Sequence, residues 1–391
     1  MKGAAGNLLR RRTGQGQAPV TPVELFFDLV FVFTVTQISE SVRAHLAPLG
    51  MLHALMLLTA VWWVWVYTAW VTNWLDPQFR PVKLLLLVLM LFGLILSAAL
   101  PEAFAGRGLA FGAALAGMQI GRSGFMLWAL RRHDERNYLN FVRITVWLTA
   151  AGLLWIAGGL LPPSARTLVW LGALGVDLCS PVLGFAVPGL GRSATREWSI
   201  DAYHMAERCS GFILIALGES ITVTGASFSA LHWSAPVGGA AFAAFLGAAC
   251  LWWIYFDRAA ELTAEDFAKS NDPGRVARAA YTYIHGVLVG GIILLAAGDA
   301  FLLEEPLSLV RFGPGSLELG GAAVFLVGNG VFRRMLRPRF PPSHIWGLVF
   351  LAALAAIAAH LTLLELGLAI CAVLLFVIVL SDMLFRQQEC K

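Results

Sequence analysis

The sequence predicts an all-α, polytopic membrane protein of about twelve transmembrane helices, arranged as two parallel six-helix repeats. Three observations predict it. The 391-residue chain is 58% hydrophobic and only 13% charged, whereas soluble domains carry about 25% charged residues. Apolar segments recur that could each cross a bilayer core of ~30 Å, which takes about 20 helical residues. The basic residues lie mainly in every second loop between these segments.

Polar residues and prolines separate the apolar segments. Thr21-Pro22 opens the first segment, and Pro162-Pro163 separates the fifth from the sixth, since proline interrupts or begins helices. Glu365 with Gly367 marks the boundary between the last two segments. The predicted spans are 21–42, 52–75, 83–101, 108–130, 143–161, 165–187, 206–226, 236–256, 280–302, 317–335, 345–364 and 366–385.

The basic residues predict the orientation of these spans. When the loops between the spans are numbered in chain order, the even-numbered loops and the two termini hold 22 of the 28 lysines and arginines. The odd-numbered loops hold 4, and the other two lie within spans. Loops rich in Lys and Arg stay in the cytoplasm, so we expect both termini to be cytoplasmic. The net charge of +4 is too small to suggest a nucleic acid partner.

Similar segments recur in the two halves in the same order. Trp62-Trp63-Val64-Trp65 resembles Trp252-Trp253-Ile254-Tyr255, and GLILSAALPEAF (93–104) shares five of twelve positions with GGIILLAAGDAF (290–301). Because each half has an even number of helices, both halves keep the same orientation, which predicts parallel repeats. The expected division is a basic disordered tail (1–20), a first repeat (21–187), a cytoplasmic connector (188–205), a second repeat (206–385) and a cytoplasmic tail (386–391).

Paired acids stand at the head of the first span. Thr21-Pro22-Val23-Glu24 fits a capping box, which would make Glu24 structural; Asp201 is the corresponding N-cap candidate before the seventh span. Asp28 lies about 6 Å further along the helix. An ionisable residue inside a span is costly without a partner or a wet cavity, so Asp28 is either functional or a buried acid that ties two helices together.

Further polar residues lie within or near the spans. Glu219 lies in the middle of the seventh span, and with Asp28 it is the strongest functional candidate. We expect these two acids to face a polar interior shared by the halves. The other candidates for an ion or solute pathway are Glu24, Glu207, Arg208, Asp177 and Arg122.

An aromatic stripe runs along the second span. Trp63, Tyr67, Trp70 and Trp74 recur at helical spacing over ~16 Å. Such a stripe is either a packing face, which is the interpretation we favour, or the lining of a cavity in which cation–π contacts form.

The sequence lacks the signatures of an enzyme, a metal site or a cofactor site. It has no H-E-x-x-H motif, and its five cysteines form no C-x-x-C pair. His204 and Glu207 share a helix face without a further ligand set. We therefore expect no enzyme activity, metal or cofactor, and the oligomeric state is left open.

Four motifs, in order, resemble the bacterial low temperature requirement protein A (LtrA) family. They are TPVELFFDLVFVFTVTQ from residue 21, WWVWVYTAWVTNWLDP (62–77), PEAF (101–104) and HMAERCSGFILIALGES (204–220). The resemblance runs from about residue 20 to at least residue 300. It implies a multi-pass protein of the bacterial inner membrane, named for a growth defect in the cold, and no established biochemical activity.

A fainter resemblance concerns Phe26-Phe27-Asp28. This tripeptide is similar to the Phe-Ser-Asp signature of a potassium-channel family that is also built from two six-helix repeats. Pro22 stands where that family has an arginine, and Gly211 stands where its second repeat has an aspartate.

Two functions of different classes follow as expectations. The first is a transporter or channel that moves a small ion or solute through the interface of the two halves, and it depends on the duplication and the intramembrane acids. The alternative is a non-transporting membrane scaffold or lipid-binding factor linked to growth in the cold or under stress. In both cases the lipid bilayer is a partner.

Overall fold

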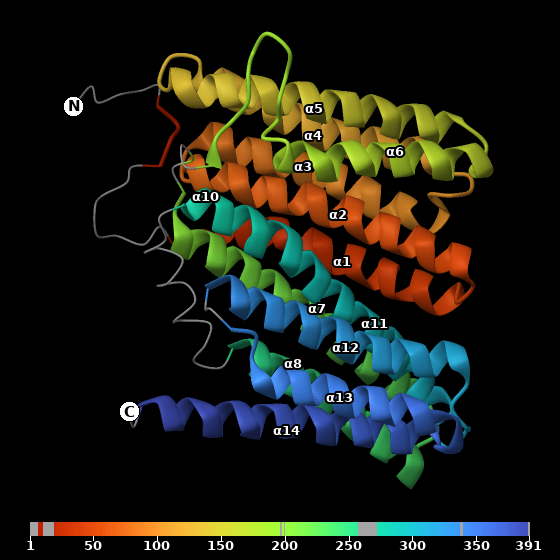
Figure 1. The fold of residues 1–391 in the computed structure, drawn as a ribbon. Helices are drawn as coiled ribbons and strands as arrows, with labels where there is room; N and C mark the ends of the chain where they lie inside the picture. The colour runs from red at the N-terminus through yellow and green to blue at the C-terminus, as the bar shows by residue number, and fades with distance from the viewer. Residues whose placement is uncertain are drawn as a thin grey trace. The chain divides into compact units, whose positions relative to one another are not determined.

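A computed structural model of the chain describes residues 7–10, 19–195, 198, 200–256, 272–336 and 339–389. The regular elements of these ranges are helices, and the ranges contain no strand (Figure 1), which confirms the all-α fold class. Within them, twelve long helices match the predicted spans one to one. They are α1 (Pro22–Ala44), α2 (Pro48–Trp74), α3 (Arg80–Ala99), α4 (Gly108–Leu130), α5 (Glu135–Leu160), α6 (Pro163–Val182), α7 (Ala202–Ala230), α8 (Ala235–Phe256), α11 (His285–Glu304), α12 (Phe312–Leu336), α13 (Pro342–Ile357) and α14 (Leu363–Glu389).

Short helical pieces extend several of these helices. The single turns η1 (Leu100–Glu102) and η4 (Ala358–His360) follow α3 and α13. The turn α10 (Pro273–Val276) and the π-helix η3 (Ala277–Ile284) lead directly into α11. Prolines occupy the first turn of α1, α2, α3, α6 and α13, where the missing N–H costs no hydrogen bond.

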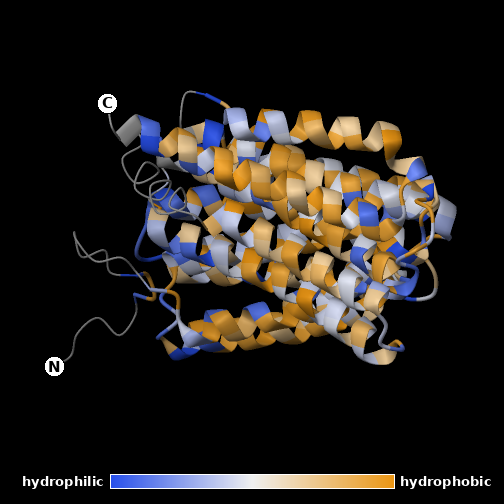
Figure 2. Ribbon diagram, turned by 90° about the horizontal axis from the view of Figure 1, so that it is seen from below, coloured by the Kyte–Doolittle hydropathy of each residue, from blue (hydrophilic) through white to orange (hydrophobic). Residues whose placement is uncertain are grey.

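Ten of the helical segments in the described ranges are long and apolar enough to cross a membrane. The two long helices that fall short, α4 and α6, carry the buried polar residues Gln119, Arg122, Arg166 and Asp177. Large apolar side chains such as Leu29 remain exposed, and hydrophilic residues gather near helix ends (Figure 2). Leucines on the outer faces of the helices can contact lipid without cost, because lipid tails are as apolar as leucine.

The chain forms two compact units, each described by its own residues. The first unit comprises the described residues within Met1–Ile38, Pro48–Gly211 and Ala268–Arg278. The second comprises those within Ser39–Ala47, Phe212–Phe267 and Ala279–Lys391.

The predicted connector 188–205 falls within the first unit. Its described part contains Gly189 and Gly191 with φ of 79° and 74°, a backbone conformation that glycine adopts without strain. The duplication into repeats 21–187 and 206–385 stays a prediction. Its best-matched residues lie in different environments, because Trp62 and Trp63 are buried whereas Trp252 and Trp253 are about half exposed.

Close helix packing in the first unit centres on α4, which contacts α2, α3 and α5, while α6 packs on α2 and α5. A Cβ atom added at Gly159 of α5 would lie 2.7 Å from the carbonyl oxygen of Gly108. At Gly112 of α4 an added Cβ would meet the carbonyl oxygen of Trp155. Glycines at these points therefore let the two backbones approach.

The second unit is built around α11 and α12, with α8 and α14 packed beside them. Its closest backbone approach is also made by glycines. A Cβ at Gly291 would lie 2.7 Å from the backbone nitrogen of Phe325, and a Cβ at Gly321 would lie 2.5 Å from that of Leu295. This close approach fixes which side chains of α11 and α12 face each other.

The N-terminal segment Asn7–Arg10 lies against the end of α2. Leu8 is buried, Leu9 forms an isolated bridge with Leu75, and the N–H of Arg10 donates to the carbonyl of Trp74 at 2.8 Å. The predicted disorder of the tail 1–20 does not hold for these residues, because backbone hydrogen bonds secure them. Residues 1–6 and 11–18 of that tail lie outside the described ranges, as do the last two residues of the predicted tail 386–391.

Candidate functional site

The site begins at the first turn of α1. The N–H of Thr21 donates to Oε2 of Glu24 at 2.9 Å, which is the Glu24 half of the predicted capping box. The Thr21 hydroxyl donates to the same oxygen at 2.8 Å instead of bonding the backbone of the helix. Glu24 is therefore a cap. Its carboxylate is also fully buried and serves further partners.

Two side chains from distant parts of the sequence converge on Glu24. Nε2 of His204, in the first turn of α7, lies 2.8 Å from Oε1 of Glu24. Nη2 of Arg10 lies 3.1 Å from Oε2, and Arg10 also donates through Nε to the carbonyl of Thr72 at 2.7 Å. The N-terminal segment thus places a cation beside an acid that would otherwise be costly to bury.

Asn73 of α2 fixes the orientation of His204. The N–H of Asp201 donates to Oδ1 of Asn73 at 2.9 Å, so the amide nitrogen of Asn73 must point the other way. That nitrogen lies 3.2 Å from Nδ1 of His204 and 2.8 Å from the carbonyl of Asp201. Nδ1 is then an acceptor and the imidazole hydrogen is on Nε2, where it faces Glu24.

Asp201 also caps α7, as the sequence predicted. Its Oδ1 accepts from the N–H of His204 at 3.0 Å. Capping and site geometry therefore involve the same residues at the beginning of both α1 and α7.

Asp28 and Arg208 form a buried two-point ion pair one turn further into these helices. Nη1 of Arg208 donates to Oδ2 of Asp28 at 2.6 Å, and Nη2 donates to Oδ1 at 2.8 Å. The indole N–H of Trp65 donates to Oδ1 at 2.8 Å, and the guanidinium carbon lies 5.5 Å from the Trp65 ring centre. A second bond from Nη1 reaches the carbonyl of Glu24 at 3.0 Å.

These five ionisable groups, named here the α1–α7 network, balance in charge. Arg10 and Arg208 offset Glu24 and Asp28. A neutral His204 accepts from Asn73 through Nδ1 and donates to Glu24 through Nε2, so Nη2 of Arg10, 3.1 Å from Nε2, is then a neighbour of that nitrogen and not a donor to it. Breaking a buried pair by removing one partner costs about 3–5 kcal/mol, because it leaves the other charge uncompensated. The network therefore ties α1 to α7 within the first unit, and it holds ionisable groups that can exchange a proton.

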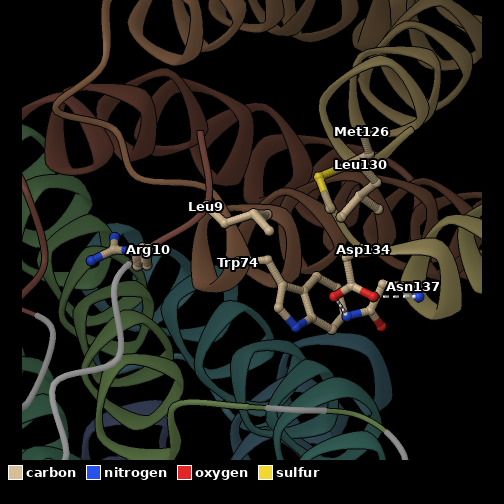
Figure 3. A pocket seen from close by; sticks show the side chains of 7 residues that line it. All are labelled: Leu9, Arg10, Trp74, Met126, Leu130, Asp134 and Asn137. Atoms are coloured by element: carbon tan, nitrogen blue, oxygen red, sulfur yellow. Dashed lines mark hydrogen bonds between the residues drawn. The ribbon is translucent and has the colours of Figure 1, made fainter. Parts of the chain in front are cut away.

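A small pocket lies beside the N-terminal segment (Figure 3). Its volume is about 70 Å³, and Figure 3 shows the guanidinium of Arg10 turned away from the other lining side chains. Ligand sites for drug-sized molecules usually measure about 300–1,000 Å³, so this pocket has room for a few waters only. Its lining residues are Leu9, Arg10, Trp74, Met126, Leu130, Asp134 and Asn137.

The candidates Arg122 and Asp177 lie elsewhere in the first unit. Nη1 of Arg122 donates to the carbonyl of Val64 and to the hydroxyl of Thr68, both at 3.0 Å, and Nη2 contacts Gln119. Asp177 accepts from the indole N–H of Trp155 at 3.0 Å through Oδ2. Both side chains are buried, and neither joins the α1–α7 network.

The aromatic stripe of α2 packs tightly. The ring centres of Trp63 and Tyr67 are 5.5 Å apart, those of Trp70 and Trp74 are 5.7 Å apart, and Trp70 meets Trp198 edge-on at 5.4 Å. These separations are typical of packed aromatic pairs, as the packing interpretation predicts. One cation–π contact does form, since the guanidinium of Arg122 lies 5.5 Å from the Tyr67 ring centre.

Glu219 and Glu207 occupy contrasting positions on α7. Glu219 is 2% exposed and lies in the second unit, next to Ser220, whose hydroxyl donates to Asp299 at 3.3 Å. Glu207 is exposed and accepts from the N–H of Val20 at 3.3 Å, and it makes no contact with Glu24 in the first unit.

Sequence reasoning selects Glu24, Asp28 and Arg208 as candidates but does not pair Asp28 with Arg208, and it misses Arg10 and His204. It places Arg10 in a disordered tail and treats His204 only as a metal ligand. The described residues contain no group of three metal-ligating side chains. A histidine three residues after an N-cap aspartate, at the head of an apolar span, is the signal that could have identified His204.

In the part of the chain that the structure describes, twelve long helices, leucines on exposed helix faces and buried, paired charges define a multi-pass integral membrane protein. The chain belongs to the bacterial low temperature requirement A protein (LtrA) family, whose profile matches residues 19–379. It is 39% identical over 344 residues to an uncharacterized protein of Rhizobium meliloti (strain 1021), across 88% of this chain and 84% of that relative. No solved structure matches the chain.

Proposed function

We propose that the protein moves a small ion or solute across the bacterial inner membrane. The observation that carries this proposal is the α1–α7 network, in which four of the five ionisable groups lie in helices long and apolar enough to cross a membrane. Ionisable residues are costly at such positions and commonly mark ion pathways and proton relays. A histidine bonded to a carboxylate through Nε2 is a pair that can pass a proton, and Arg10 holds this pair from the N-terminal side.

A reconstitution experiment tests the proposal. Purified protein in liposomes should pass protons or a monovalent cation faster than protein-free liposomes, as measured with an enclosed pH dye and ion-selective dyes. Glu24→Gln keeps the cap to Thr21 and removes the charge, and it should reduce this flux. The double variant Asp28→Asn with Arg208→Gln removes both charges of the buried ion pair together and should also reduce the flux.

The matched control is Glu102→Gln. Glu102 is exposed and pairs with Arg107 at 3.4 Å outside the network, so its loss should leave the flux unchanged. No flux above protein-free liposomes for protons, Li⁺, Na⁺, K⁺, Rb⁺ and Cs⁺ would overturn transport of protons or monovalent cations.

A non-transporting membrane scaffold is the second candidate. It is favoured by the engagement of both acids, since each carboxylate oxygen of Glu24 and Asp28 already accepts a hydrogen bond within the first unit. If the protein is such a scaffold, the Glu24→Gln variant should fold and the wild type should pass no ion.

We also propose that both termini face the cytoplasm, on the basis of the asymmetry of basic residues. After replacement of the five native cysteines with alanine, Leu307→Cys should react with a membrane-impermeant maleimide added to intact cells. His133→Cys should react only after the cells are opened. Both side chains are exposed, so access to reagent decides the outcome, and the reverse pattern would contradict the orientation.

A further inference from the structure

The second unit holds a pair of buried acids that differ from the α1–α7 network in one respect. Asp299 of α11 is 3% exposed and Glu318 of α12 is 2% exposed. The described part of the chain contains no Lys, Arg or His that forms an ion pair with either of them.

The glycine contact between α11 and α12 brings the carboxyl group of Glu318 against the backbone next to Asp299. A Cβ at Gly298, directly before Asp299, would lie 3.0 Å from the carboxyl carbon of Glu318 and 3.1 Å from its backbone nitrogen. The carboxyl group of Glu318 therefore packs on the backbone beside Asp299. With Gly321 of α12 also against α11, neither helix can move aside without losing this packing.

Acceptors and donors at the pair do not match. Asp299 accepts one hydrogen bond, from the hydroxyl of Ser220 at 3.3 Å, and among the described residues Oε1 of Glu318 has no hydrogen-bond partner. The hydroxyl of Thr224, one turn beyond Ser220 on the same face of α7, is 92% buried and also lacks a partner there. Buried polar atoms are rarely left unpaired, so an acceptor of this site can take a hydrogen bond from a further donor.

Among the described residues, the other titratable groups around the pair supply no positive charge. Cys371 of α14 and Cys250 of α8, on helices that pack against α11, are buried thiols, and a thiol carries no positive charge. Glu219 of α7, next to Ser220, would add a further negative charge if ionised. Two ionised carboxylates in this surrounding would each lose their hydration and also repel each other.

We propose that Asp299 and Glu318 form a proton-binding site that holds one proton between the two carboxyl groups at neutral pH. Binding the proton removes one of the two charges and creates an O–H donor, which the unfilled acceptors of the pair can bond. Two like carboxyl groups that share a buried site take up a proton for the same reason in aspartic proteases. The site concerns proton binding and stands independently of whether the protein transports an ion.

Infrared spectroscopy of the full-length protein in lipid vesicles at neutral pH tests this site. The wild type should show a protonated-carboxyl carbonyl band that the double variant Asp299→Asn with Glu318→Gln lacks. The same band should shift in heavy water, because its proton is exchangeable. Asparagine and glutamine imitate the shape of the protonated acids, so the double variant should fold, which monodisperse elution in detergent checks.

A double variant of two exposed glutamates is the control, and two results would overturn the proposal. The double variant Glu304→Gln with Glu305→Gln, at the exposed end of α11, should leave the band as in the wild type. An identical carbonyl spectrum for the wild type and the Asp299/Glu318 double variant would overturn the proposal, since both acids would then be ionised. Loss of the wild-type band on addition of Na⁺ or K⁺ at constant pH would assign the site to that cation instead and overturn proton binding.

Discussion

Arg208→Gln is expected to destabilise the folded protein more than any other single substitution in the α1–α7 network. Among the described residues, it leaves the buried carboxylate of Asp28 with only Trp65 as a hydrogen-bond donor. Removing one partner of a buried ion pair costs about 3–5 kcal/mol, a large fraction of the 5–15 kcal/mol that is typical of a folded domain. The amount of monodisperse protein and its unfolding midpoint in detergent should both fall sharply.

The double variant Asp28→Asn with Arg208→Gln should recover much of this loss, because it leaves no uncompensated charge. A double-mutant cycle on Asp28 and Arg208 would then give a coupling free energy of more than ~1 kcal/mol. Arg107→Gln removes a cation from an exposed pair with Glu102 and should have little effect, as surface pairs contribute little. An Arg208→Gln protein as stable as the wild type would show that the α1–α7 network does not hold the first unit together.

Gly321→Ala is expected to cost about 1–3 kcal/mol, the usual range for overpacking a close contact. The new Cβ would lie 2.5 Å from the backbone nitrogen of Leu295 and 2.9 Å from the carbonyl oxygen of Gly291. Both neighbours are backbone atoms that cannot rotate away, so α11 and α12 must separate. The unfolding midpoint in detergent measures the effect.

Gly320 supplies a matched control one residue earlier on the same helix. A Cβ there meets nothing within 4 Å, and alanine has the higher helix propensity by about 1 kcal/mol. Gly320→Ala should therefore be neutral or stabilising. Equal behaviour of the two alanine variants would mean that α11 and α12 do not approach as closely as described.

The two buried groups of acids point to different chemistry. In the first unit, Glu24 and Asp28 are offset by Arg10 and Arg208, so their burial stabilises one arrangement of α1 and α7. In the second unit, Asp299 and Glu318 have no such cation among the described residues, so a proton is the simplest way to reduce their charge. Flux measurements test the first group and infrared spectroscopy tests the second, and each result is informative without the other.

The sequence by itself determined the fold class and the position of each helix. Crossing a bilayer demands a long apolar run and a helical backbone, and these are local properties that composition and proline positions reveal. The twelve predicted spans therefore match the long helices, with shifts of up to eight residues at the ends. Local capping was also predictable, because Thr21–Glu24 and Asp201 act within one turn of the chain.

Only the tertiary structure decided which buried charges are partners. Arg10 reaches Glu24 across 14 residues of sequence, and Arg208 reaches Asp28 across 180, distances over which helical periodicity carries no information. The same holds for Glu318, whose carboxyl group packs on the backbone beside Asp299 because Gly298 and Gly321 let α11 and α12 approach closely. In an apolar chain nearly every helix face is hydrophobic, so hydrophobic pattern does not select neighbours. Backbone contact at glycines and the pairing of buried charge select them, and both depend on residues far apart in the chain.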